Sequence, residues 1–277
     1  MPLDMLLRSQ LTHIRRGMAR SMLLSRVAAY ASRQLQGVVC ERLGGDPDSD
    51  RNGEQRLIEM LGPHISTFVD VGANVGDWSA RVVGAASQLE RGHLLEPNRA
   101  ACARLEERFA DLTSLRIHPV AAARTPGTIE FFEEPGCGET SSTVAGSSRA
   151  DAVRREVPCT TVDAFLGDEG IEELDWLKID AEGADLAVLQ GAIGSLSAHR
   201  VRWVQFEYNG AWIRAGARLS DALELLDDHG YRTLLIHPRG LLDFPYDIYR
   251  DFYGYSNFLA ASPSSRDALA PLLAGAA

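Results

Sequence analysis

The sequence contains few cysteines and no apolar run long enough to cross a membrane. Its four cysteines are widely spaced, form no Cys-x-x-Cys pair and have no histidine nearby at zinc-site spacing, which favours free thiols in a reducing compartment. A helix that spans a bilayer needs about 20 apolar residues. Near the N-terminus, arginines interrupt the apolar residues, unlike those of a secretory signal. These absences predict a cytoplasmic protein.

The chain also lacks a net positive charge. Its 28 Lys and Arg residues are outnumbered by 38 Asp and Glu residues, for a net charge of −10. Nonspecific binding of nucleic acid requires clustered cations that neutralise phosphates. With 277 residues, 45% hydrophobic and 24% charged, the composition is that of a globular protein with one main domain. A small-molecule substrate is therefore expected, and a nucleic-acid partner is not.

The N-terminal arm differs from the rest of the chain. Up to about residue 33, apolar residues recur at spacings of three and four, which predicts one or two amphipathic helices. Six arginines accompany a single acid, Asp4. We expect this arm to pack on the main domain or on a second subunit, giving a homo-oligomer; contact with a membrane surface is the alternative. A polar linker and a short helix follow, and the predicted domains are residues 1–62 and 63–277.

Residues 67–78 read as a short buried strand, a glycine turn and the start of a helix. Gly72 and Gly76 bracket the turn, where the lack of a Cβ lets the backbone approach a ligand. Asn74 stands where the dinucleotide motif G-x-G-x-x-G has its second glycine. Asp70, at the strand end, would repel a pyrophosphate. The turn therefore favours S-adenosylmethionine over NAD, and a purely structural connection is the alternative.

Four predicted strands end in an acid: Asp70, Glu96, Asp180 and Glu207. Ligands of open α/β sheets bind beyond the carboxyl ends of the strands, so these acids should face one crevice. Glu96 lies 20 residues after Gly76, the distance at which a strand-end carboxylate reaches the ribose hydroxyls of a nucleoside. A helix cap explains any one such acid. Four at corresponding strand ends favour a binding site.

Other candidates follow further strands. Ala121, after the predicted third strand, would leave room for an adenine ring. Residues 134–157 read as a long surface loop, from which Ser142 is a candidate contact to the cofactor or the acceptor. His237 ends another predicted strand and is a reserve general base, because imidazole titrates near neutral pH; a structural histidine is the alternative. The aromatic-rich residues 241–255 suit a wall of an acceptor pocket or plain packing.

The combination of these motifs resembles the FkbM family of S-adenosylmethionine-dependent methyltransferases. The resemblance covers about Thr67 to Ala261. It implies an α/β fold of the class I methyltransferase (Rossmann-like) type, with helices on both faces of a seven-stranded, mostly parallel sheet ordered 3-2-1-4-5-7-6, the last strand antiparallel. The matching motifs are residues 68–76, Glu96-Pro97-Asn98, residues 160–163, 177–183 and 188–192, and Phe206-Glu207.

The resemblance also implies an activity and a set of contacts. Members usually methylate a hydroxyl of a sugar, polyketide or other natural product, which places the chain in natural product biosynthesis. By position, Glu96 should accept the ribose hydroxyls, and Asp180 should lie nearest the methyl-transfer point. Ala181 and Ala184 replace a common valine and a common aromatic residue, which leaves the acceptor open. The remaining implied cofactor contacts are Asp70, Gly72, Ala73, Asn74, Val75, Gly76, Pro97 and Asn98.

An alcohol is a poor nucleophile, so its methylation calls for a general base or a metal ion. We hypothesise that Asp180 and Glu207 face the acceptor, either binding Mg²⁺ through carboxylate oxygens or acting as base and orienting group, with His237 in reserve. Carboxylate and nitrogen acceptors are the alternative within this activity. A nucleotide-sugar oxidoreductase should have a glycine in place of Asn74 and a Tyr-x-x-x-Lys pair, which is absent. A cofactor-binding module without catalysis is a further alternative.

Overall fold

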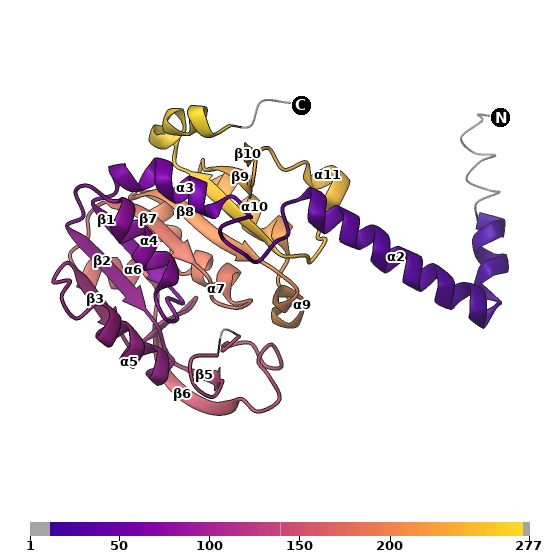
Figure 1. Cartoon of the computed structure of the whole chain (residues 1–277), viewed down its shortest axis with the longest axis horizontal. Coiled ribbons are helices and arrows are strands. Elements are labelled where there is room, and N and C mark those ends of the chain that lie inside the picture. The colour runs from indigo at the N-terminus through magenta and orange to yellow at the C-terminus, as the bar shows by residue number, and fades with distance from the viewer. Residues whose placement is uncertain (1–11, 139, 274–277) are drawn as a thin grey trace. The chain divides into compact units, whose positions relative to one another are not determined.

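The computed structural model describes residues 12–138 and 140–273, which fall into two compact units, Met1–Arg42 and Leu43–Ala277. In the first unit, residues 12–19 are helical and α2 (Met22–Arg42) follows (Figure 1). The predicted helical arm is therefore present from residue 12 on, with its last helix extending beyond residue 33. The part of that prediction that falls on residues 1–11 lies outside the described residues. No described helix is long and apolar enough to cross a membrane. The unit boundaries differ from the predicted domains, and the division at residue 62 stays a prediction.

The second unit is built on one large sheet in the order β10-β9-β11-β8-β7-β1-β2-β3. Seven strands follow the order implied by the resemblance, and β11 is antiparallel to both neighbours. The predicted strand count was wrong by one, because the turn after β9 returns the chain along the edge as β10. The strands are β1 (Thr67–Val71), β2 (Arg91–Leu95), β3 (Leu115–His118), β7 (Leu174–Ile179), β8 (Val201–Tyr208), β9 (Arg232–His237), β10 (Gly240–Leu242) and β11 (Ser256–Ala261).

A small second sheet has the order β4-β6-β5. Its strands are β4 (Ala121–Ala122), β5 (Gly127–Glu133) and β6 (Val153–Thr160). The predicted loop over residues 134–157 is therefore too long, since β6 begins at Val153. The first four residues of β6 are exposed, so they lack the alternating apolar pattern that reveals a strand. Their position is instead set by antiparallel pairing with β5.

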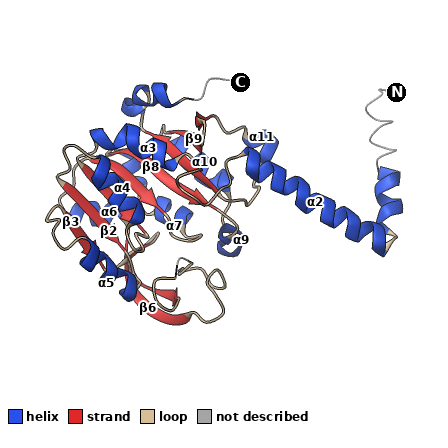
Figure 2. Cartoon of the chain, in the orientation of Figure 1, coloured by secondary structure: helices blue, strands red, loops and turns tan. Residues whose placement is uncertain are grey.

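Helices cover the large sheet (Figure 2). Side chains of α3 and α4 pack with Phe68, Trp176 and Trp203 in one apolar core. Two short helices, α7 and α8, lie on either side of Gly191, where a Cβ would lie 2.2 Å from the carbonyl oxygen of Ala123. The helices are α3 (Glu54–Leu61), α4 (Asp77–Ala85), α5 (Arg99–Arg108), α6 (Val162–Asp168), α7 (Asp185–Gln190), α8 (Ile193–Ser197), α9 (Ala211–Ala215), α10 (Leu219–Asp228) and α11 (Tyr246–Tyr249), with 3-10 turns η1 (Gly62–His64), η2 (Pro263–Ser265) and η3 (Asp267–Leu272).

Candidate active site at the strand ends

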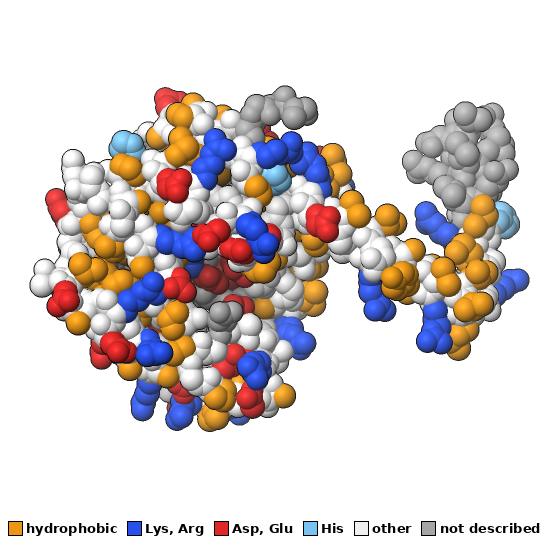
Figure 3. Space-filling model, viewed as in Figure 1, with side chains coloured by type: hydrophobic (Ala, Val, Ile, Leu, Met, Phe, Trp, Pro, Cys, Tyr) orange, Lys and Arg blue, Asp and Glu red, His pale blue; other side chains and the backbone are white. Residues whose placement is uncertain are grey.

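A cavity of about 490 Å³ lies beyond the carboxyl ends of β1, β2, β7 and β8. Figure 3 shows a hollow with acidic side chains inside it. Most residues singled out from the sequence line this one cavity, as the topology of a parallel sheet requires. Asp70, Gly76 and His237 do not line it. The predicted residues that do are Gly72, Ala73, Asn74, Val75, Glu96, Pro97, Asn98, Ala121, Ser142, Asp180 and Glu207.

The turn after β1 is pressed against the end of β7. Gly72 has φ +77°, and a Cβ there would lie 1.9 Å from the carbonyl oxygen of Asp180. The absence of a side chain at Gly72 therefore permits contact between two parts of the protein backbone. Gly76 has φ +82° at the start of α4, where a Cβ would meet Leu105 and Phe109. Gly76 thus serves the packing of α4 on α5, outside the cavity.

Asp70 lies beneath the cavity. It is fully buried, accepts a hydrogen bond from Ser79 Oγ (2.6 Å) and lies 3.8 Å from Lys178 Nζ. Burial raises the pKa of its carboxyl group, and Lys178 and Ser79 partly oppose that rise. Asp70 lies between the buried hydroxyl of Ser79 and the buried ammonium group of Lys178, so its carboxyl group is well placed to hold Lys178 in position. The predicted direct contact of Asp70 with a cofactor stays a prediction.

Glu96 lies at the cavity wall with its carboxylate held by backbone amides. Asn74 N donates to Oε2 (2.9 Å) and Asn98 N donates to Oε1 (2.7 Å). Burial raises the pKa of Glu96 to about 7, although these two hydrogen bonds favour the ionised form. The Asn98 side chain also caps α5 by accepting from Ala100 N and Ala101 N. The two amide hydrogen bonds therefore fix the orientation of the Glu96 carboxyl group. Its pKa is unusually high for a carboxyl group.

This titration predicts a pH-dependent affinity for S-adenosylhomocysteine. If the ribose hydroxyls donate to Glu96, ionisation provides the better acceptor, so the dissociation constant should fall as pH rises through about 7. Glu96→Gln should weaken binding and flatten this pH dependence. Calorimetric titration at several pH values measures both effects, with exposed Glu90→Gln as the matched control. An unchanged pH profile in Glu96→Gln would remove Glu96 from the binding site.

Lys178, the only lysine of the chain, was not singled out from the sequence. It is buried on β7, donates to Asp180 Oδ2 (2.9 Å) and pairs in register with Asp70 on β1. Burial lowers its pKa, but the carboxylates of Asp180, Asp70 and Glu54 outweigh burial and raise it. Lys178 is therefore a permanent cation in the wall of the cavity. Alternation along β7 places Lys178 and Asp180 on the same face of the sheet, and this signal was available in the sequence.

Three carboxylates meet at the ends of β7 and β8. One oxygen each of Asp180, Glu182 and Glu207 lies within 4.8 Å of the others. Asn209 Nδ2 donates to Glu207 (2.6 Å). Burial is the largest cause that raises the pKa of Glu207 well above its usual value and that of Glu182 to about 8, and neighbouring acids add to it. Glu182 was missed as a candidate, although it lies two residues after Asp180, because its backbone turns in the left-handed region (φ +49°) and so returns its side chain to the site.

The raised pKa of Glu182 predicts that this side chain lowers stability at alkaline pH. A carboxyl group with a higher pKa in the folded state stabilises the fold below its unfolded pKa, and this contribution is lost as pH rises through the folded value of about 8. Glu182→Gln should therefore raise the melting temperature at pH 9 relative to the wild type and change it less at pH 5. Thermal unfolding followed by circular dichroism at both pH values measures the difference. Equal changes in the melting temperature at pH 5 and pH 9 would contradict the raised pKa of Glu182.

The segment between β5 and β6 closes one side of the cavity. Ser142 Oγ donates to the carbonyl oxygen of Glu182 (2.7 Å) and accepts from Val144 N (2.9 Å). Asn98 Nδ2 donates to Ser141 Oγ (3.3 Å). Ser142 therefore connects this segment to the acidic cluster, and its hydroxyl is already used within the protein.

His237 lies apart from the cavity. Its side chain is mostly buried at the end of β9, and its Nδ1 accepts from Arg239 N (3.1 Å) in the turn that leads to β10. A small separate depression lies against it, and a Cβ on Gly53 would meet its carbonyl oxygen at 2.3 Å. These contacts suit a structural histidine, and we do not carry His237 into the mechanism. Of the aromatic-rich residues 241–255, Tyr255 is the one that lines the cavity.

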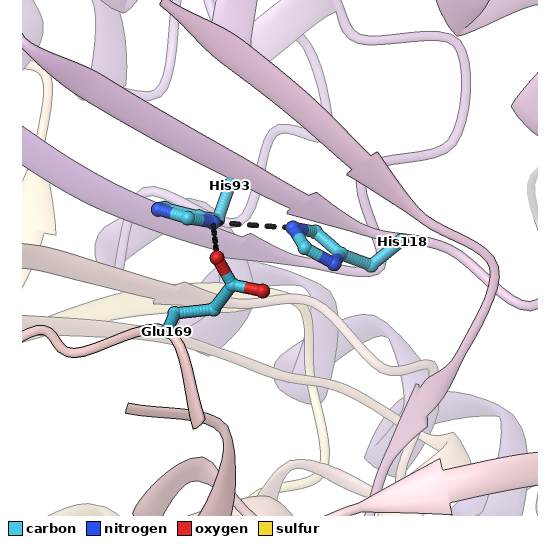
Figure 4. Close-up of side chains that lie close together, drawn as sticks. All are labelled: His93, His118 and Glu169. Carbon is cyan, nitrogen blue, oxygen red and sulfur yellow. Dashed lines mark hydrogen bonds and ion pairs between the residues drawn. The ribbon is translucent and has the colours of Figure 1, made fainter. Parts of the chain in front are cut away.

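A second group of potential metal ligands, His93, His118 and Glu169, lies away from the cavity (Figure 4). His93 Nδ1 is 3.1 Å from His118 Nε2 and 3.8 Å from the Glu169 carboxylate, which also accepts from Arg116 (3.0 Å). Burial, aided by His118, lowers the pKa of His93 to about 4. Both rings pack against Phe165. A hydrogen bond between neutral imidazoles and an ion pair with Arg116 account for this group.

Comparisons with known proteins agree with the geometry. The profile of the methyltransferase FkbM domain matches residues 70–233. The chain is 24% identical to the 2-O-methyltransferase NoeI of Sinorhizobium fredii (strain NBRC 101917 / NGR234) over 209 residues, which cover 70% of this chain and 84% of that protein.

Solved structures of methyltransferases are also similar. The crystal structure of methyltransferase FkbM from Methylobacillus flagellatus is 18% identical with a TM-score of 0.45, covering 70% of this chain but only 43% of that one. SMU.1697c from Streptococcus mutans, in complex with SAH, is 9% identical with a TM-score of 0.44, covering 76% and 98% of the two chains. The family match spans more than half of the chain and contains the β1 turn, Glu96, Asp180 and Glu207. The chain therefore belongs to the FkbM family and is an S-adenosylmethionine-dependent methyltransferase.

Proposed function

We propose that this enzyme methylates a hydroxyl group of a small molecule, a sugar or a glycosylated natural product. The observation that carries the proposal is the acidic cluster of Asp180, Glu182 and Glu207, which lines the same cavity as the β1 turn and Glu96. A hydroxyl acceptor has to lose a proton, and buried carboxylates suit that task. The 2-O-methyltransferase named above supports the same class of acceptor atom.

In this proposal, the two substrates occupy different sides of the cavity. Asn74 and Glu96 lie on the side of β1 and β2 and, in this proposal, hold the nucleoside of S-adenosylmethionine. Tyr255 and Asn257 lie on the side of β8 and β11, where Asn257 Nδ2 donates to Tyr255 Oη (3.1 Å). Hydroxyl and amide groups of this kind suit a polyhydroxylated acceptor. Alignment of the acceptor oxygen behind the methyl group then supplies much of the rate.

The acidic cluster takes up the proton of the acceptor. As the bond between the acceptor oxygen and the methyl carbon forms, the bond from that carbon to sulfur breaks, and Glu207 accepts the hydroxyl proton. The burial that raises the pKa of Glu207 makes it a stronger base than an exposed carboxylate. Asp180, which accepts from Lys178, orients the acceptor by receiving a second hydroxyl. The positive charge of Lys178, 2.9 Å from Asp180 Oδ2, also offsets part of the negative charge of the acidic cluster.

The same oxygens fit a divalent cation. Magnesium prefers oxygen ligands, and Asp180, Glu182 and Glu207 offer three within 4.8 Å. When bound, Mg²⁺ would increase the acidity of the acceptor hydroxyl. In that case the three carboxylates hold the ion, and their mutual repulsion is relieved by its charge.

Mass spectrometry of methyl transfer tests this proposal. The purified protein is incubated with S-adenosylmethionine and a panel of glycosides, with either added Mg²⁺ or EDTA, and matched carboxylic-acid and amine acceptors serve as controls. We expect a mass gain of one methyl group on a glycoside hydroxyl. Loss of turnover in EDTA that is restored by Mg²⁺ would support the metal-assisted route. Unchanged turnover in EDTA would support Glu207 as a general base that acts without a metal ion. Methylation confined to carboxylates or amines would contradict the proposal.

A further inference from the structure

The helix α2 carries an exposed apolar face. None of its residues is buried; Leu23, Leu35 and Val38 are 71%, 68% and 62% exposed. Successive residues of a helix are about 100° apart, so most of the large apolar residues of α2 fall within about half of its circumference, with the exposed Met22 outside that half. A continuous apolar band of this width on a surface calls for an occupant. The exposed residues of the band are Leu23, Leu24, Val27, Tyr30, Leu35 and Val38, and the half-buried Val39 lies at its edge.

The charges of the same unit indicate the occupant. Residues 12–42, the described part of this unit, contain six arginines and one acid, Glu41, although the whole chain has a net charge of −10. Arg26 and Arg33, two turns apart, lie on the side of α2 opposite the apolar band. Figure 3 shows Arg and apolar side chains together over this helix. An apolar face backed by arginines is complementary to a lipid surface with anionic headgroups.

We propose that α2 binds the surface of an anionic membrane, with its apolar band in the interfacial region and its arginines at the headgroups. A second copy of α2 is a poorer occupant, because a two-helix seam is narrower than this band. This inference is independent of the proposed acceptor and concerns residues outside the family match.

Vesicle co-sedimentation of the full chain tests the proposal. The protein is mixed with vesicles of phosphatidylcholine alone or of phosphatidylcholine with phosphatidylglycerol. We expect binding to the anionic vesicles, at least about tenfold weaker binding for the double variant Arg26→Glu, Arg33→Glu, and weaker binding at high salt. The double variant Arg104→Glu, Arg154→Glu has the same change in net charge at exposed positions of the second unit and should bind like the wild type.

A second variant separates lipid binding from self-association. Leu24→Ser, Leu35→Ser removes apolar residues from the band and keeps the arginines, so it should also lose vesicle binding while remaining folded by circular dichroism. Sedimentation velocity of the same proteins gives their oligomeric state. Absence of binding to anionic vesicles, or equal loss in both charge-reversal variants, would overturn the proposal. A dimer that becomes monomeric in Leu24→Ser, Leu35→Ser without vesicle binding would assign the band to a second copy.

Discussion

Replacing Glu207 by glutamine or Asp180 by asparagine is expected to lower kcat/KM for the methyl acceptor by about 10²- to 10⁴-fold. Each change keeps the shape of the side chain and removes its negative charge, so the acceptor hydroxyl loses the group that takes or steers its proton. The affinity for S-adenosylhomocysteine should change by no more than a few-fold, because Glu96 and the β1 turn remain intact. Steady-state kinetics with the identified acceptor and calorimetric titration measure the two quantities.

The control for these variants is Glu224→Gln, an exposed position on α10 outside the cavity, which should leave kcat/KM unchanged. Thermal unfolding of each variant shows whether a loss of activity results from a loss of fold. We expect Asp180→Asn to stay folded, because Lys178 keeps the charges of Asp70 and Glu54 as neighbours. Near-normal kcat/KM in both Asp180→Asn and Glu207→Gln would show that another group handles the proton.

Gly72→Ala should be among the most damaging small substitutions in this protein. The left-handed backbone at Gly72 costs about 1–2 kcal/mol for a residue with a side chain, and a Cβ 1.9 Å from the carbonyl oxygen of Asp180 forces β1 and β7 apart. We expect the free energy of unfolding to fall by at least about 3 kcal/mol and binding of S-adenosylhomocysteine to weaken. Chemical denaturation followed by circular dichroism measures the change in stability.

Gly84→Ala is the matched control for Gly72→Ala. Gly84 lies in α4, and nothing stands within 4 Å of a Cβ added there. Because alanine favours a helix more than glycine does, this variant should be as stable as the wild type or more stable by up to about 1 kcal/mol. If Gly72→Ala were as stable as Gly84→Ala, the close packing of the β1 turn on Asp180 would be wrong.

The order of seven strands of the large sheet followed from the resemblance to the FkbM family, and the gathering of strand-end acids was predictable from the sequence pattern. Buried parallel strands appear as short apolar runs, and each here ends in an acid or glycine that marks the carboxyl edge. That edge is one place in space, so Glu96, Asp180 and Glu207 could be assigned to one cavity from positions far apart in the chain.

Other features depend on details that a single sequence does not display. Alternation along β7 could have indicated that Lys178 shares a face with Asp180, but its pairing with Asp70 follows from the register of β1 and β7, which the sequence does not display. Glu182 enters the cluster through a left-handed backbone turn. Glu54 reaches the cavity from α3, ahead of the family match. His237 ends a strand as expected, but β9 is separated from the cavity by β11, so its strand-end position did not bring it to the site.

The most direct test of the account is calorimetric titration of the purified protein with S-adenosylhomocysteine and, separately, with NAD. The account predicts saturable binding of one S-adenosylhomocysteine and none of NAD. It predicts binding at least about tenfold weaker in Glu96→Ala and little changed in the double variant Asp180→Asn, Glu207→Gln. No binding by well-folded protein, or equal affinity in Glu96→Ala, would contradict the placement of the cofactor in this cavity.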